Sequence, residues 1–336
     1  MIKAKKEEIF NVFRTATTMN SSGKTKNGST FQQQSPLRNG WATLDNALRA
    51  LTLSATRAQY YAAALGSRTR GLTALHVAAS RGDLRVVEQL LEKATINVDT
   101  QATSGQTSIH LAAAYGHTEV VKVLLDKGAD IHATANEQES ALHDAAYGGH
   151  VEVVEVLLDK GADIHARTKG QQNALHQAAS RGHVEVVEVL LDKGADIHAT
   201  TDRQWSALHC AAYGGHVEVV KVLLDKGADI HTTADSGWSA FHGAASGGHV
   251  EVLKVLLDKG ADIHATDDWQ WSALHFAASR GRVGVVKVLL EYGMNIEEKT
   301  IAGYTALDLA RTPDVVRLLM VEAATGISNP ISDSSV

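Results

Sequence analysis

The sequence predicts an all-α solenoid of about eight helix-turn-helix units, joined by β-hairpin-like fingers. Three observations predict it: a recurring residue pair, a repeated ten-residue block, and helix-capping residues in register with both. The pair is Leu, Ile or Phe followed by histidine, at His76, His110, His143, His176, His209, His242 and His275. The first step is 34 residues and the next five are 33. Self-similarity at a fixed period of this length is typical of stacked repeats.

Each predicted first helix begins after a residue that can cap it. Three positions before each of those histidines stands Thr, Ser or Asn, whose side-chain oxygen can accept a hydrogen bond from a free backbone N–H. One further period leads to Asp308, and the same rule holds there. The predicted N-caps are Thr73, Thr107, Ser140, Asn173, Ser206, Ser239, Ser272 and Thr305.

A second helix is predicted in each unit. The block Val-Leu-Leu-Asp-Lys-Gly-Ala-Asp-Ile-His recurs unchanged at 123–132, 156–165, 189–198, 222–231 and 255–264. In the third unit, apolar residues at helical spacing predict the buried stripe, and two more valines widen it. The stripe is Val151, Val154, Leu157 and Leu158, widened by Val153 and Val156. The opposite, polar side holds Glu152, Glu155 and Asp159.

Glycines predict where the second helices end. Gly161 stands at a C′ position, where a left-handed backbone is needed to terminate a helix. Its counterparts are Gly128, Gly194, Gly227, Gly260 and Gly293. The last unit is shortened by four residues, and Pro313 is expected to open its second helix. This unit is expected to serve as a C-terminal cap.

The period and the Leu-His pair resemble the ankyrin-repeat family, whose signature is Thr-Pro-Leu-His-x-Ala. The resemblance covers roughly residues 70–322. The signature proline is Ala or Ser in every unit, at Ala74, Ser108, Ala141, Ala174, Ala207, Ala240, Ala273 and Ala306. Alanine is a good helix former, so this departure leaves the expected fold unchanged. The resemblance implies that partners are bound by the fingers and the inner face of the first helices.

The expected organisation places repeats between two unlike ends. Residues 1–40 form a basic head without fixed structure, and residues 41–70 are helical, as a degenerate N-terminal capping repeat. Residues 323–336 form a disordered tail. The repeats span 71–104, 105–137, 138–170, 171–203, 204–236, 237–269, 270–302 and a truncated 303–322.

Charge is divided unevenly along the chain. Residues 1–68 hold ten Lys or Arg and three Asp or Glu, a net charge of +7. Because the whole chain has a net charge of −6, the remainder carries −13. The basic, hydroxyl-rich head leaves organelle targeting as an alternative, although Glu7 and Glu8 disfavour it. The acidic remainder repels phosphates and disfavours nucleic acid as a partner. With the lone cysteine, Cys210, and no apolar segment long enough to span a membrane, we expect an intracellular protein, cytoplasmic or nuclear.

The seventeen histidines do not predict a metal site. Equivalent histidines lie one repeat apart, roughly 8–10 Å, whereas two ligands of one zinc ion need donor atoms within about 3.5 Å. We expect them to cap helices and to hydrogen-bond within and between units. No catalytic motif is present, and Cys210 has no dedicated base in the pattern. The sequence therefore predicts no enzyme and no cofactor.

Residues that vary against the repeated background can report specificity. Four residues before each histidine of the Leu-His pairs lies a finger position, which is aromatic in repeats five to eight. Trp and Tyr are over-represented among interface hot spots. The predicted partner-binding residues are Trp205, Trp238, Trp271, Tyr304, Trp269, Tyr147, Tyr213, Asp202, Asp235 and Asp268, with Asp267 also flanking. The alternative is that the tryptophan rings only pack on neighbouring fingers and stiffen them.

The function expected from this pattern is a non-catalytic protein-protein interaction module: a scaffold, adaptor or inhibitor. The acid-flanked aromatic surface suits a basic or apolar segment of a protein partner. The alternative function is recruitment of a substrate for a separate enzyme subunit. We expect the chain to be monomeric.

Overall fold

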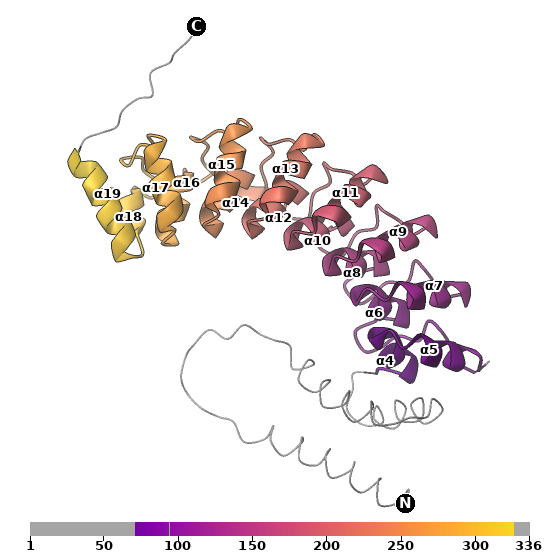
Figure 1. Ribbon diagram of the computed structural model, residues 1–336. Helices are drawn as coiled ribbons and strands as arrows, with labels where there is room; N and C mark the ends of the chain where they lie inside the picture. The colour runs from indigo at the N-terminus through magenta and orange to yellow at the C-terminus, as the bar shows by residue number, and fades with distance from the viewer. Residues whose placement is uncertain (1–70, 94, 326–336) are drawn as a thin grey trace, which may run out of the picture. The chain divides into compact units, whose positions relative to one another are not determined.

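The computed structural model describes residues 71–93 and 95–325, all within one compact unit, Leu53–Val336. The described residues form sixteen α-helices and no strand. Figure 1 shows the helices as consecutive pairs, with the first helix of each pair on the inner side of the curved stack of described repeats. The predicted head 1–40, the predicted helical segment 41–70, and residues 326–336 of the predicted tail lie outside the described residues.

The helix bounds repeat with the sequence period. The first helices are α4 (Ala74–Arg81), α6 (Ser108–Ala114), α8 (Ala141–Gly148), α10 (Ala174–Arg181), α12 (Ala207–Gly214), α14 (Ala240–Gly247), α16 (Ala273–Ser279) and α18 (Ala306–Leu309). The second helices are α5 (Leu84–Leu91), α7 (Thr118–Asp126), α9 (Val151–Asp159), α11 (Val184–Asp192), α13 (Val217–Asp225), α15 (Val250–Asp258), α17 (Val283–Glu291) and α19 (Pro313–Thr325). Pro313 thus opens the last helix as predicted, and this helix continues beyond the expected end of the repeats at residue 322.

All eight predicted N-caps precede a first helix, and in each the cap's backbone N–H donates to the side chain of the third helical residue. The predicted bond to the cap's own side-chain oxygen, at 3.1 to 3.4 Å, is present for Thr73, Asn173, Ser239 and Thr305. In α12 the backbone N–H of Ser206 donates to Nδ1 of His209 at 3.2 Å. The hydroxyl of Ser206 also contacts Nδ1, at 2.8 Å. Because a backbone N–H only donates, Nδ1 is the unprotonated ring nitrogen. The histidine must therefore be neutral to complete the cap.

The same histidine rings join one repeat to the next. Nε2 of His209 donates to the carbonyl oxygen of Trp238 at 3.1 Å, and Nε2 of His176 donates to that of Trp205 at 3.0 Å. A carbonyl oxygen only accepts, which places the ring proton on Nε2. The expected role of these histidines in capping and in bonding between units is confirmed.

A second series of histidines bonds back to the preceding repeat. His150, just before α9, places Nε2 3.0 Å from the carbonyl oxygen of Ala114, at the end of α6. His117, His183, His216 and His249 make the equivalent bond. In the seventh repeat Arg282 takes this place, with Nε donating to the carbonyl oxygen of Ser246 at 3.0 Å. Carbonyl groups left free at the ends of the first helices are therefore satisfied by the next repeat.

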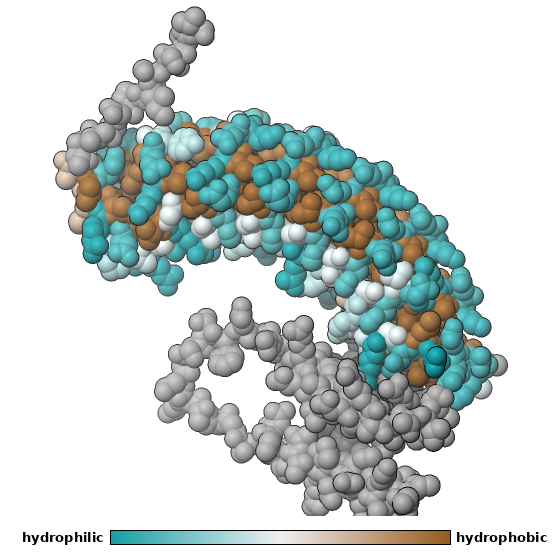
Figure 2. Space-filling model, in the orientation of Figure 1, coloured by the Kyte–Doolittle hydropathy of each residue, from teal (hydrophilic) through white to brown (hydrophobic). Residues whose placement is uncertain are grey.

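The core of each second helix differs in part from the predicted stripe. In α9 the fully buried residues are Val153, Val154 and Leu157. Val151 and Leu158 are only half-buried, because they lie near the two ends of the helix, where fewer neighbours cover them. The polar side, with Glu152, Glu155 and Asp159, is exposed as predicted. Figure 2 shows hydrophobic residues in a band along the described repeats, flanked by hydrophilic ones.

The predicted C′ glycines all adopt the left-handed backbone. Gly161 has φ +95°, and the amide of the following Ala162 donates to the carbonyl oxygen of Leu157 at 2.9 Å. The equivalent glycines have φ between +76° and +96°. An added Cβ at Gly161 would meet no atom within 4 Å. The backbone conformation, rather than space, therefore requires glycine there.

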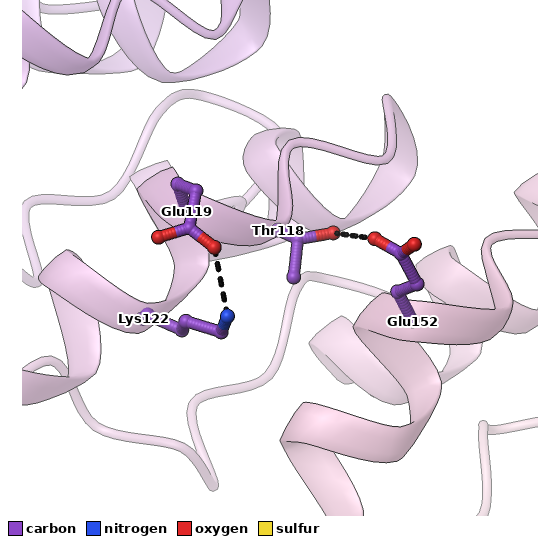
Figure 3. Close-up of polar contacts among 4 residues, drawn as sticks. All are labelled: Thr118, Glu119, Lys122 and Glu152. Carbon is purple, nitrogen blue, oxygen red and sulfur yellow. Dashed lines mark hydrogen bonds and ion pairs between the residues drawn. The ribbon is translucent and has the colours of Figure 1, made fainter.

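Exposed polar contacts run along the second helices. Lys122 bonds to Glu119 within α7 at 2.7 Å, while Thr118 reaches Glu152 of α9 at 3.3 Å (Figure 3). Lysines after four second helices pair with an aspartate of the preceding repeat, as in Lys193–Asp159 at 2.7 Å. Such half-exposed pairs contribute little to stability. They mark the outer row of helices as a charged, solvated face.

The last repeat leaves an apolar groove at the C-terminal end of the stack. Pro313, Val316 and Met320 of α19 line it together with Ala310. Met320 is 56% exposed. This end of the stack therefore exposes apolar side chains. Within the described ranges, no helix is both long and apolar enough to cross a membrane.

Candidate protein-binding surface

Two variable positions face each other in the repeats. One is the finger position, four residues before the histidine of each Leu-His pair; the other is the helix position, directly after that histidine. In the fourth repeat, Nε2 of Gln177 at the helix position donates to Oε1 of Gln172 at the finger position, at 2.9 Å. In the seventh, the rings of Trp271 and Phe276 lie 5.0 Å apart. Both positions therefore lie on the surface made by the fingers and the first helices.

The finger tryptophans are packed and only partly exposed. Trp205 meets the edge of Tyr213, with ring centroids 5.7 Å apart. Trp238 lies 4.5 Å from Phe276 of the next repeat, which also contacts Trp271. All three tryptophans are half-buried. The alternative placed these rings against neighbouring fingers, whereas the ring contacts found are with Tyr213 of α12 and Phe276 of α16, and part of each ring still faces solvent.

Other predicted aromatic residues are well exposed. Trp269 is 56% and Tyr304 52% exposed, at neighbouring fingers. These two fingers are joined by the backbone, because the amide of Ile301 donates to the carbonyl oxygen of Trp269 at 3.0 Å. Tyr147 and Tyr213, near the ends of α8 and α12, are 47% and 42% exposed. Aromatic surface thus continues from the fingers onto the first helices.

The flanking acidic residues take two different roles. Asp202, Asp235 and Asp268 are exposed on three successive fingers. Their amides donate to carbonyl groups of the preceding finger, at 2.9 to 3.1 Å, which holds them in register. Asp267 is instead 7% exposed, and its Oδ1 accepts the backbone N–H groups of Trp269 and Trp271. Asp267 therefore supports the finger, and the other three carry charge at the surface.

Two residues of this surface that sequence reasoning missed are acidic. Asp144, at the helix position of the third repeat, is half-buried, and its Oδ2 is buried without a hydrogen-bond partner. Burial, with a smaller contribution from the nearby charge of Glu139, raises the pKa of this carboxyl to about 8. Glu139 is the finger residue of the same repeat. Comparing the two variable positions within each repeat would have shown the acidic pair.

Several ionisable groups of the inner row have pKa values shifted by burial. Burial raises the pKa of the Cys210 thiol to about 12, so the reactive thiolate is not populated at neutral pH. Burial lowers the pKa of His176 and His209 to about 4. Throughout the part of the chain that the structure describes, no group of three or more His, Cys, Asp or Glu is placed to hold a metal ion.

Comparisons with solved structures and with family profiles agree with this architecture. Comparison with curated proteins gives no match. The crystal structure of the human ASB11 ankyrin repeat domain is similar, with a TM-score of 0.60 and 30% identity, covering 64% of this chain and 97% of that one. The sequence profile of the family described as "Ankyrin repeats (3 copies)" matches residues 42–135, 132–201, 175–267 and 242–331. This chain therefore belongs to the ankyrin-repeat family, which generally serves as a protein-binding module.

Proposed function

We propose that the chain is a non-catalytic interaction module that binds a protein partner across the fingers and first helices of repeats five to eight. The observation that supports this most is the aromatic and acidic surface carried by successive fingers. Trp269 and Tyr304 are more than half exposed there, although neighbouring tryptophans are packed. Exposed aromatic rings beside fixed carboxylates suit an apolar segment with basic residues.

The packing of the three finger tryptophans decides which residues to change. Replacing Trp205, Trp238 or Trp271 removes contacts with Tyr213 or Phe276 and would also disturb the fold. The sharper variant combines Trp269→Ala with Tyr304→Ala, because both side chains are exposed. Tyr292→Ala is the matched control: its ring is 41% exposed, but it follows α17 in the outer row.

The test is affinity capture from cell extract with the full chain as bait, followed by mass spectrometry. We expect the Trp269→Ala/Tyr304→Ala bait to lose the proteins that the wild type and Tyr292→Ala capture, with unchanged circular dichroism. Equal capture by all three baits would refute the proposed surface. Stable capture of one enzyme would favour the substrate-recruiting role, whereas several unrelated partners would favour a scaffold.

A further inference from the structure

We propose that Asp144 and Glu139 form an anchor site for an arginine side chain of the protein partner. The inference rests on the proposed function in that it assumes a protein ligand on the same face. It adds a separate site in the third repeat and names the chemical group that this site binds.

The acidic pair lies where other repeats pair their side chains. Gln177 and Gln172 stand at the two positions one repeat later, and they share a hydrogen bond of 2.9 Å. In the third repeat both positions hold carboxyl groups, which cannot satisfy each other when ionised. Each residue is half-buried, so the pair can still be reached from solvent.

Within the described ranges nothing in the chain neutralises Asp144. Its Oδ2 is buried and has no hydrogen-bond partner, and no ion pair reaches the residue. A buried carboxyl without a partner costs free energy, and natural proteins rarely keep one. Its pKa is raised to about 8, so this carboxyl stays largely protonated until a cation arrives. A basic side chain from outside supplies both the missing charge and the missing donors.

The neighbouring ring favours a guanidinium over an ammonium group. Tyr147 stands three residues after Asp144 in α8, on the same side of the helix, and is 47% exposed. The protein already stacks one guanidinium on this row: the Cζ of Arg181 lies 3.9 Å from the ring centroid of Tyr147. Arginine combines flat stacking with paired donors for carboxylates, which lysine lacks. Two carboxyl groups near the exposed ring of Tyr147 therefore match arginine.

The probe is the blocked peptide acetyl-Gly-Arg-Gly-amide, compared with the same peptide carrying uncharged citrulline. Binding to the full chain is followed at pH 7 by the thermal unfolding midpoint and by NMR of labelled aspartate carboxyl groups. We expect the arginine peptide to raise the midpoint saturably and to lower the pKa of Asp144 by at least one unit. The citrulline peptide should do neither.

Two variants locate the effect. Asp144→Asn should weaken binding of the arginine peptide at least tenfold while the protein stays folded. Asp258→Asn, which removes an exposed carboxylate at the end of α15, should bind as the wild type does. Equal binding by Asp144→Asn, or equal binding of the two peptides, would overturn the proposal. The Trp269→Ala/Tyr304→Ala protein should bind the peptide normally, so a failure here is separable from a failure of the aromatic surface.

Discussion

Acid should destabilise the repeats through their capping histidines. Each such ring accepts at Nδ1 from its cap and donates from Nε2 to a backbone carbonyl, which belongs to the next repeat in all but His242 and His275. A second proton on Nδ1 therefore breaks the cap. Burial accordingly lowers the pKa of all seven from 6.5, and for His176 and His209 to about 4. Because the folded pKa lies below the unfolded one, the stabilisation is complete above pH 6.5. It is lost as the pH falls toward 4.

The magnitude follows from the pKa values of His176 and His209. At pH 5 the unfolded histidines are mostly protonated and the folded ones are not, which lowers the free energy of unfolding by about 2 kcal/mol for each of His176 and His209. The other five histidines act in the same direction. Asp144 opposes them, because its folded pKa is raised to about 8 and its penalty shrinks as the pH falls. The experiment therefore uses the Asp144→Asn variant, in which this opposing contribution is absent.

The assay is urea unfolding of Asp144→Asn at pH 7, 6 and 5, with NMR titration of the histidine rings. We expect a loss of about 4 kcal/mol or more between pH 7 and 5, since the histidine contributions add. In the folded protein His176 and His209 should not titrate above pH 5. Equal stability at the two pH values, or folded-state titration of both rings near 6.5, would refute the reasoning.

Three further predictions follow from single sites. Asp144→Asn should raise the free energy of unfolding by roughly 2–4 kcal/mol at pH 7, but by less than about 1 kcal/mol at pH 4, where the unfolded carboxyl is about half protonated. Urea unfolding at the two pH values measures this, and an equal gain at both would contradict it. Gly161→Ala should lower the free energy of unfolding by about 1–2 kcal/mol in the same assay, because only the left-handed backbone opposes it. Gly149→Ala should lower it more, because the added Cβ would lie 2.5 Å from Nδ1 of His183. The reverse order would show that the glycines are retained for another reason. Lys193→Met should leave the urea midpoint close to that of the wild type, because the ion pair with Asp159 is half-exposed. A shift as large as that of Gly161→Ala would show that the exposed ion pairs stabilise the fold.

Most of the candidate surface could be located from the sequence, but not how its residues are used. The register of variable positions predicted which side chains stand on the fingers, including the exposed acids. It could not separate Trp269, which is exposed, from Trp271, which packs on Phe276. The finger has neither helical nor strand periodicity from which the side of each ring could be predicted. It also did not separate Asp268 from Asp267, since only the folded finger brings the amides of Trp269 and Trp271 onto Asp267.

The sequence by itself determined the repeats, their helix caps and the glycines that end the helices. Each of these depends on atoms within a few residues along the chain, as in the bond between Ser206 and His209, so the local pattern is sufficient. Tertiary structure decided which faces are buried and which ionisable groups have no hydrogen-bond partner. The burial of Trp238 against Phe276 joins residues of different repeats. The burial of the Asp144 carboxyl is likewise set by the surrounding fold, because exposure depends on every neighbour that excludes water, and those neighbours come together only when the repeats stack.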